Sequence, residues 1–104
     1  MCGDYLLTVE YTSKKLMKVC IDAKTAEKQY GRQMAEKIQF RIDQIKAADS
    51  VEFLVQHRIG RCHPLTGNRK GQYAMDLVHP YRLIFIPEDD TTVSVLIEEI
   101  ADYH

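Results

Sequence analysis

The sequence predicts an α+β fold in which two N-terminal helices pack on a four-stranded, mainly antiparallel sheet, in the order β-α-α-β-β-β. Three observations support this prediction. A short extended segment opens the chain, two stretches with helical spacing follow it, and the last third alternates strand-forming segments with turn residues. The chain has 104 residues, 45% of them apolar and 28% charged, so we expect a single domain over residues 1–104.

One strand and two helices are expected in the first half of the chain. Residues 5–11 are rich in β-branched and aromatic side chains, which favours a strand. Ser13 can then cap a helix over residues 14–22, where apolar side chains recur at i, i+3, i+4 and i+7. Residues 24–48 repeat this spacing as one long helix. Gly31 costs about 1 kcal/mol there relative to alanine and marks either a local weakness or a point of close packing.

Three further strands are expected in the second half. Ser50 caps a short helix of one or two turns over residues 51–56. Pro80 cannot donate a hydrogen bond to a neighbouring strand, so it belongs in a turn. After a loop, apolar and β-branched side chains predict strands over residues 72–78, 81–86 and 93–100.

The loop over residues 57–71 has the least balanced charge in the sequence. It contains four of the fourteen Lys and Arg residues, two of the four His residues, and no Asp or Glu. Its three glycines and one proline let the backbone approach a ligand closely. A net charge of −1 argues against a uniformly basic nucleic-acid binder, but the acids cluster elsewhere. The loop therefore predicts a local site for an anionic ligand.

Arg82 interrupts an otherwise apolar strand, where burial of an unpaired guanidinium is costly. Two interpretations remain open at this point. Arg82 either pairs with an acid, such as Asp76 on the neighbouring strand or an acid near the chain end, or it binds an anionic ligand. The basic side chains of the loop likewise either contact that ligand or form a solvated surface.

The cysteines and histidines do not predict a metal site. Cys2, Cys20 and Cys62 are odd in number and widely spaced, which is typical of free thiols in a reducing compartment. No Cys-x-x-Cys or His-x-x-x-His spacing is present, so we expect neither a metal ion nor another cofactor. No leader and no apolar stretch of about 18 residues is present, which indicates a cytoplasmic protein.

A histidine near arginines is better suited to proton transfer or phosphate contact than to metal binding, because histidine titrates near neutral pH. His63 has this context. Cys62 and His63 do not predict a nucleophile–base pair, because adjacent side chains in extended chain point to opposite faces. Tyr103 and His104 follow the last strand directly, so that strand would hold them near Arg82.

Five segments together carry a family resemblance. They are residues 15–20 and 30–39 in the helical part, the loop motif RCHPLTGNRKG at 61–71, HPYRLIF at 79–85 and EIADYH at 99–104. With these segments, the chain resembles the HigB-type, or plasmid-maintenance killer, toxins of the RelE/ParE superfamily over nearly its whole length.

The resemblance implies a RelE-like fold and a toxin of a type II toxin-antitoxin system. Such a toxin is a metal-independent endoribonuclease, or mRNA interferase, that enters the ribosomal A site, cuts messenger RNA there and inhibits translation. Its expected partner is a HigA-like helix-turn-helix antitoxin. The toxin is expected to be held at operator DNA only through this antitoxin. Carried over by position, the resemblance implies the catalytic residues His63, Arg82, Tyr103 and His104 and the RNA-binding residues Arg61, Arg69 and Lys70.

The chain departs from the family pattern in the loop and at Pro80. Thr66 and Asn68 stand where relatives often have a lysine and an aspartate, so weaker RNA binding or an altered codon preference is expected. Two alternatives stay open. A ParE-like poison of DNA gyrase without nuclease activity has the same fold, and an inactive toxin can persist as a co-repressor with its antitoxin. The combination of Arg82, Tyr103 and His104 favours RNA cleavage.

Overall fold

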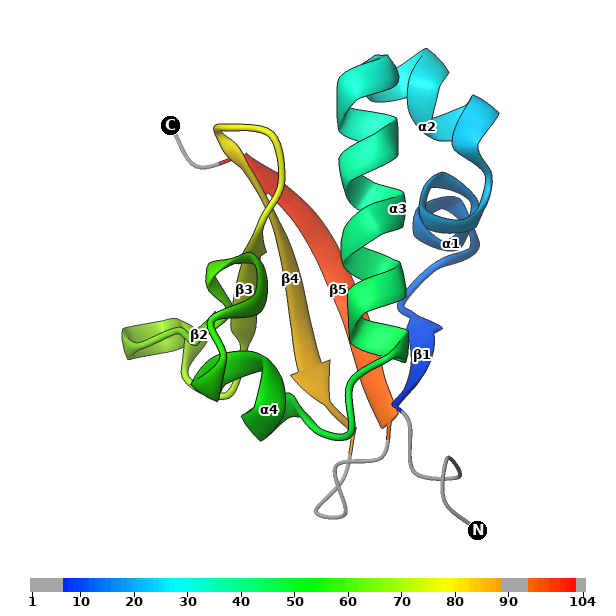
Figure 1. Cartoon of the computed structure of the whole chain (residues 1–104). Coiled ribbons are helices and arrows are strands. Elements are labelled where there is room, and N and C mark those ends of the chain that lie inside the picture. Colours follow the sequence, from blue (N-terminus) through cyan, green and yellow to red (C-terminus); the bar gives the residue numbers. More distant parts are fainter. Residues whose placement is uncertain (1–6, 89–93, 103–104) are drawn as a thin grey trace, which may run out of the picture.

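The computed structural model describes residues 7–88 and 94–102 and places its helices against a single sheet (Figure 1). The sheet has five strands in the order β1-β5-β4-β3-β2. Positions 5 and 6 of the expected first strand, position 93 of the expected last strand, Cys2, Tyr103 and His104 lie outside the described residues. The strands are β1 Thr8–Tyr11, β2 His63–Pro64, β3 Tyr73–Asp76, β4 Tyr81–Pro87 and β5 Ser94–Asp102.

This sheet corrects the predicted one in two respects. It has five strands rather than four, because His63–Pro64 forms a two-residue strand beside β3 within the basic loop. A pairing this short leaves no alternation to detect in the sequence. The sheet is also mixed rather than mainly antiparallel, because β1 pairs with β5 in parallel. The pairings of β3 with β4 and of β4 with β5 are antiparallel, as predicted.

Three helices stand where two were predicted, so the element order β-α-α-β-β-β is also corrected. The first, α1 Lys14–Ile21, begins at Ser13, whose hydroxyl accepts the predicted capping hydrogen bond. The predicted long helix is divided into α2 Ala23–Tyr30 and α3 Arg32–Lys46 by Gly31. Gly31 has a φ of 94° and a ψ of 165°, a conformation that interrupts a helix and that residues with a side chain rarely adopt.

The short helix α4 Val51–Gln56 confirms the prediction for residues 51–56, and Ser50 caps it through the Phe53 N–H. Two single 3₁₀ turns follow within the basic loop, η1 Ile59–Arg61 and η2 Gly67–Arg69. Within the described ranges, no helix combines the length and the apolar character that crossing a membrane requires.

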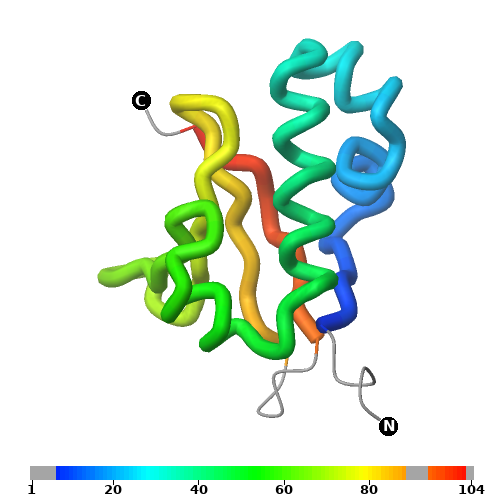
Figure 2. The backbone as a smooth tube through the Cα atoms, viewed as in Figure 1, coloured from blue at the N-terminus to red at the C-terminus, as the bar shows by residue number. Residues whose placement is uncertain are grey.

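The helices pack on one face of the sheet and enclose the main core there (Figures 1 and 2). The opposite face, called the outer face below, carries a separate small apolar cluster of Ala74, Ile84 and Ala101, with Leu65 packed against it. Side chains alternate along a strand, so residues two positions from these three also belong to the outer face. The largest fully buried side chains of the chain include Phe85, Ile38, Ile42, Ile45, Leu54 and Met75.

Candidate functional site

The register of the strands brings two of the predicted catalytic residues to the outer face. His63 pairs with Ala74, and Arg82 pairs with Asp76 on one side and with Ala101 on the other. Neighbouring strands lie about 4.8 Å apart, so the backbones of β2 and β4 are separated by about 10 Å. A phosphate-bearing ligand lying over β3 on the outer face is therefore within reach of long side chains from both β2 and β4.

Asp76, at the end of β3, is the centre of a cluster of arginines. Its Oδ2 lies 3.3 Å from Nε of Arg61, and its Oδ1 lies 3.6 Å from Nε of Arg82. The main-chain oxygen of Asp76 accepts a hydrogen bond of 2.6 Å from Nε of Arg41 on α3. Arg82 is therefore paired with Asp76, as one of the two open interpretations held. The carboxylate of Asp76 is thus shared by two guanidinium groups, while a third, that of Arg41, bonds to the main-chain oxygen of the same residue.

The cluster borders a polar hollow of about 120 Å³, which Arg61, Asp76, His79 and Arg82 line together with the β3–β4 turn. The side chains of Arg82 and Asp76 are 33% and 30% exposed, whereas that of Arg61 is 79% exposed. Arg82 is thus held within the sheet surface, while Arg61 extends into solvent from the loop. An anion entering the hollow meets one half-buried guanidinium and one exposed guanidinium, both paired with Asp76.

Arg41 reaches Asp76 only because residue 60 is a glycine. Gly60 has a φ of 58°, and a Cβ added to it would lie 2.8 Å from Nε of Arg41. Partial burial lowers the pKa of Arg41, and the nearby charge of Asp76 opposes that shift. Sequence reasoning missed Arg41, because a base on an amphipathic helix resembles an ordinary surface residue. No local signal in the sequence links α3 to the end of β3.

The backbone around η1 is strained at two residues that are not glycine. Arg58 and Arg61 have φ values of 52° and 58°, in the left-handed region that costs other residues about 1–2 kcal/mol each. Such strain persists where surrounding contacts hold it, and it is common at functional sites. Here the strained turn carries Arg61 to Asp76 and leads directly into His63.

His63 lies on the short edge strand β2, and its Nδ1 is 2.8 Å from the main-chain oxygen of Arg61. A carbonyl oxygen can only accept a hydrogen bond, so Nδ1 carries the proton in this pair. The neutral ring then has an unprotonated Nε2, which is the nitrogen able to take a proton from a substrate. The structure thus gives His63 a defined tautomer suited to a general base.

The two remaining bases of the predicted RNA-binding set lie apart from this cluster. Arg69 donates from Nη2 to Oε2 of Glu99 at 3.0 Å and from Nη1 to Oε1 of Gln72 at 2.9 Å. Lys70 is exposed on the loop, beside a separate hollow that Leu65 and Thr66 help to line. The basic loop is therefore divided into one part around Asp76 and another around Glu99.

Cys62 is buried at 3% exposure, and burial raises the pKa of its thiol to about 12. The thiol is protonated at neutral pH, so Cys62 is unsuited to act as a nucleophile beside His63. Across residues 7–88 and 94–102, no three His, Cys, Asp or Glu side chains gather as ligands for a metal ion. Tyr103 and His104 are outside the described residues, but β5 extends to Asp102, the register partner of Tyr81.

No protein-family model matches the chain, and no curated protein does so. Solved structures of toxin-antitoxin proteins share its fold. The YoeB–YefM complex from Staphylococcus aureus is 24% identical, with a TM-score of 0.60 over 94% of this chain and 97% of that chain. The YoeB/ParE toxin from Agrobacterium tumefaciens is 12% identical, with a TM-score of 0.62 over 94% and 100%. The RelBE2 toxin-antitoxin complex from Mycobacterium tuberculosis is 15% identical, with a TM-score of 0.53 over 94% and 99%.

These likenesses show that the chain has the RelE-like α+β fold found in toxin-antitoxin complexes. At this level of identity they concern the arrangement of helices and strands and leave the roles of individual side chains open. The neighbours named here are of the YoeB, ParE and RelBE types, so the resemblance to HigB in particular stays a prediction.

Proposed function

We propose that the chain is the toxin of a type II toxin-antitoxin system and acts as a metal-independent endoribonuclease on messenger RNA in the ribosomal A site. The observation that carries this proposal is the convergence of Arg61 and Arg82 on Asp76. Two guanidinium groups held beside each other are suited to bind the phosphate of a nucleic acid. The RelE-like fold supports the same assignment.

In the proposed reaction, the ribose 2′-oxygen attacks the adjacent phosphorus and the 5′-oxygen of the next nucleotide leaves. His63 takes the proton of the 2′-hydroxyl at Nε2, and His104 returns a proton to the departing 5′-oxygen, which leaves a 2′,3′-cyclic phosphate and a free 5′-hydroxyl. Arg82 stabilises the charge that develops on the five-coordinate phosphate. Tyr103 stacks on a neighbouring base.

Asp76 has a positioning role in this proposal. Its carboxylate engages Nε of both Arg61 and Arg82, which fixes where the two guanidinium groups lie before RNA arrives. A fixed charge stabilises a transition state better than a mobile one, because no reorganisation is needed during the reaction. The same carboxylate lowers the net charge seen by RNA, so orientation comes at some cost in affinity.

The proposed partners follow from the same assignment. A HigA-like helix-turn-helix antitoxin neutralises the toxin and holds it at operator DNA, while the ribosome presents the messenger RNA. Arg69 and Lys70 contact RNA phosphates away from the point of cleavage. Arg69 already pairs with Glu99, so its contact with RNA is shared with that carboxylate and is weaker than that of an unpaired arginine.

The test is primer-extension mapping of messenger RNA after brief expression of the wild type and of Arg82→Ala. We expect new cuts within translated codons for the wild type and a loss of these cuts in the variant. Growth arrest without cuts, accompanied by DNA-damage induction, would instead support a gyrase poison. Neither cuts nor arrest, with operator binding retained alongside the antitoxin, would identify an inactive co-repressor.

A further inference from the structure

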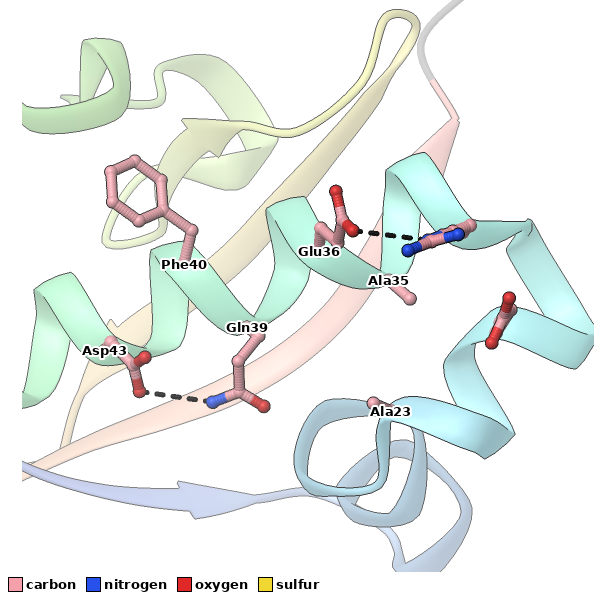
Figure 3. A pocket seen from close by; sticks show the side chains of 8 residues that line it. Ala23, Ala35, Glu36, Gln39, Phe40 and Asp43 are labelled. Atoms are coloured by element: carbon pink, nitrogen blue, oxygen red, sulfur yellow. Dashed lines mark hydrogen bonds and ion pairs between the residues drawn. The ribbon is translucent and has the colours of Figure 1, made fainter.

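The side of the molecule formed by the helices contains an apolar hollow with an acidic rim. It lies between α2 and α3 and has a volume of about 460 Å³ (Figure 3). Ala23, Ala35 and Phe40 supply its apolar surface, and Phe40 is 52% exposed. The exposed ring of Phe40 and the apolar hollow beside it together offer a surface on which another protein can pack.

The rim of the hollow is negatively charged overall. Three carboxylates line it, from Glu27, Glu36 and Asp43, against one guanidinium, that of Arg32. Arg32 lies 3.5 Å from Glu36 and offsets that charge, whereas the carboxylate of Asp43 accepts a hydrogen bond from the neutral amide of Gln39. A partner for this hollow should therefore combine apolar side chains with positive charge.

The chain itself carries such a surface on α1. Met17 and Ile21 are 38% and 55% exposed, and they lie one turn apart on the same side of the helix. Lys14 and Lys18, also exposed and one turn apart, flank them. The exposed face of α1 is thus a pair of apolar side chains beside a pair of positive charges, complementary to the hollow in both properties.

The two surfaces adjoin each other in the fold. Ala23 lines the hollow, and it follows the end of α1 by two residues. A surface made of two adjoining, complementary halves can pair with a copy of itself across a two-fold axis, because each half then meets the other half of the partner. Closed two-fold dimers are the commonest form of soluble oligomer.

We propose that this chain forms a two-fold dimer in which the exposed face of α1 from each copy enters the hollow between α2 and α3 of the other. Met17 and Ile21 contact Phe40 of the second copy, while Lys14 and Lys18 face the acids of the rim. The proposal is independent of the proposed nuclease function, since neither the residues that line the hollow nor the exposed residues of α1 contact Asp76.

The experiment is sedimentation velocity of the purified full chain over a range of concentrations, with two charge-reversal variants. One variant is Lys14→Glu with Lys18→Glu, and the other is Glu27→Lys with Asp43→Lys. When a variant pairs with a copy of itself, like charges meet at both contacts. We therefore expect the dissociation constant of each variant's dimer to be at least about tenfold higher than that of the wild type. An equal mixture of the two variants places opposite charges at both contacts, so the mixture should regain dimers.

Restoration on mixing also guards against misfolding, because a variant that fails to fold cannot be rescued by a second one. Phe40→Ser should weaken the dimer as well, whereas Phe53→Ser is a matched control, since Phe53 is 40% exposed and lies on α4, outside both surfaces. A wild type that stays monomeric at every concentration overturns the proposal. The proposal is also overturned if neither charge-reversal variant weakens the dimer, or if mixing the two variants does not restore it. In these cases the hollow binds another occupant, such as an antitoxin segment.

Discussion

The arginine cluster on the outer face and the rim of the helical hollow both contain several charges, but they are built differently. In the cluster, Asp76 is shared among Arg41, Arg61 and Arg82, and its side chain is 30% exposed. On the rim, the Arg32–Glu36 pair has side chains that are 82% and 71% exposed. Shared, partly buried charges depend on one another, whereas exposed charges act almost independently. The cluster is therefore arranged to fix positions, and the rim to attract a partner.

Changes to the proposed catalytic residues of the outer face should have the largest effects, and these should be on catalysis. His63→Gln keeps a polar side chain but removes Nε2 as a base, so we expect the cleavage rate on programmed ribosomes to fall by about 10²–10⁴-fold. His57→Gln is the matched control, because His57 belongs to the same loop but packs on Phe53. Equal rates for His63→Gln and the wild type would remove His63 from the reaction.

Gly60→Ala should reduce stability as well as activity. The substitution forces a side chain into a left-handed conformation and pushes Arg41 away from Asp76, so we expect a loss of about 1–3 kcal/mol in the free energy of unfolding. Urea unfolding of Gly60→Ala, Arg41→Ala and the double variant measures this. The double variant should lose less than the sum of the two single losses, because Arg41→Ala removes the clash. Strict additivity would contradict the proposed link between the two residues.

Asp76→Asn should separate binding from turnover. Removing the carboxylate leaves Arg61 and Arg82 with more net charge but less fixed positions, so we expect KM to fall while kcat falls by about tenfold. A purely structural role would lower activity through instability and leave KM unchanged or raised. Steady-state kinetics on programmed ribosomes, with Asp76→Glu as the conservative variant that partly restores kcat, distinguishes the two cases.

The sequence predicts those parts of the fold that depend on neighbouring residues, and it misses those that depend on contacts between distant segments. Local signals were sufficient for β3, β4 and β5, for α4, and for the caps at Ser13 and Ser50. The sequence marks Gly31 as a local weakness or a point of close packing, but whether a glycine bends or ends a helix depends on its φ, which the sequence does not specify. The two-residue strand β2 and the parallel pairing of β1 with β5 depend on contacts between distant segments.

For the site, the sequence predicted the Arg82–Asp76 pair as one of two interpretations, because an arginine in an apolar strand needs a partner. It did not predict that Arg61 shares this acid, or that Arg41 reaches it past Gly60, because these residues lie on three separate elements. The pairing of Arg69 with Glu99 also joins residues thirty positions apart in the sequence. Charges are visible in a sequence, but their partners are set by the tertiary fold.

The smallest effect is expected on the rim, where Glu36→Gln is the counterpart of Asp76→Asn. Both substitutions replace a carboxylate paired with arginine by its amide, but the Arg32–Glu36 pair is mostly solvated. We therefore expect the free energy of unfolding to change by no more than about 0.5 kcal/mol for Glu36→Gln, and cleavage to remain at the wild-type rate. Parallel urea titrations of the two variants measure the contrast directly. A loss for Glu36→Gln well above about 0.5 kcal/mol would mean that the rim charges also depend on one another, and that the two regions do not differ in the way proposed.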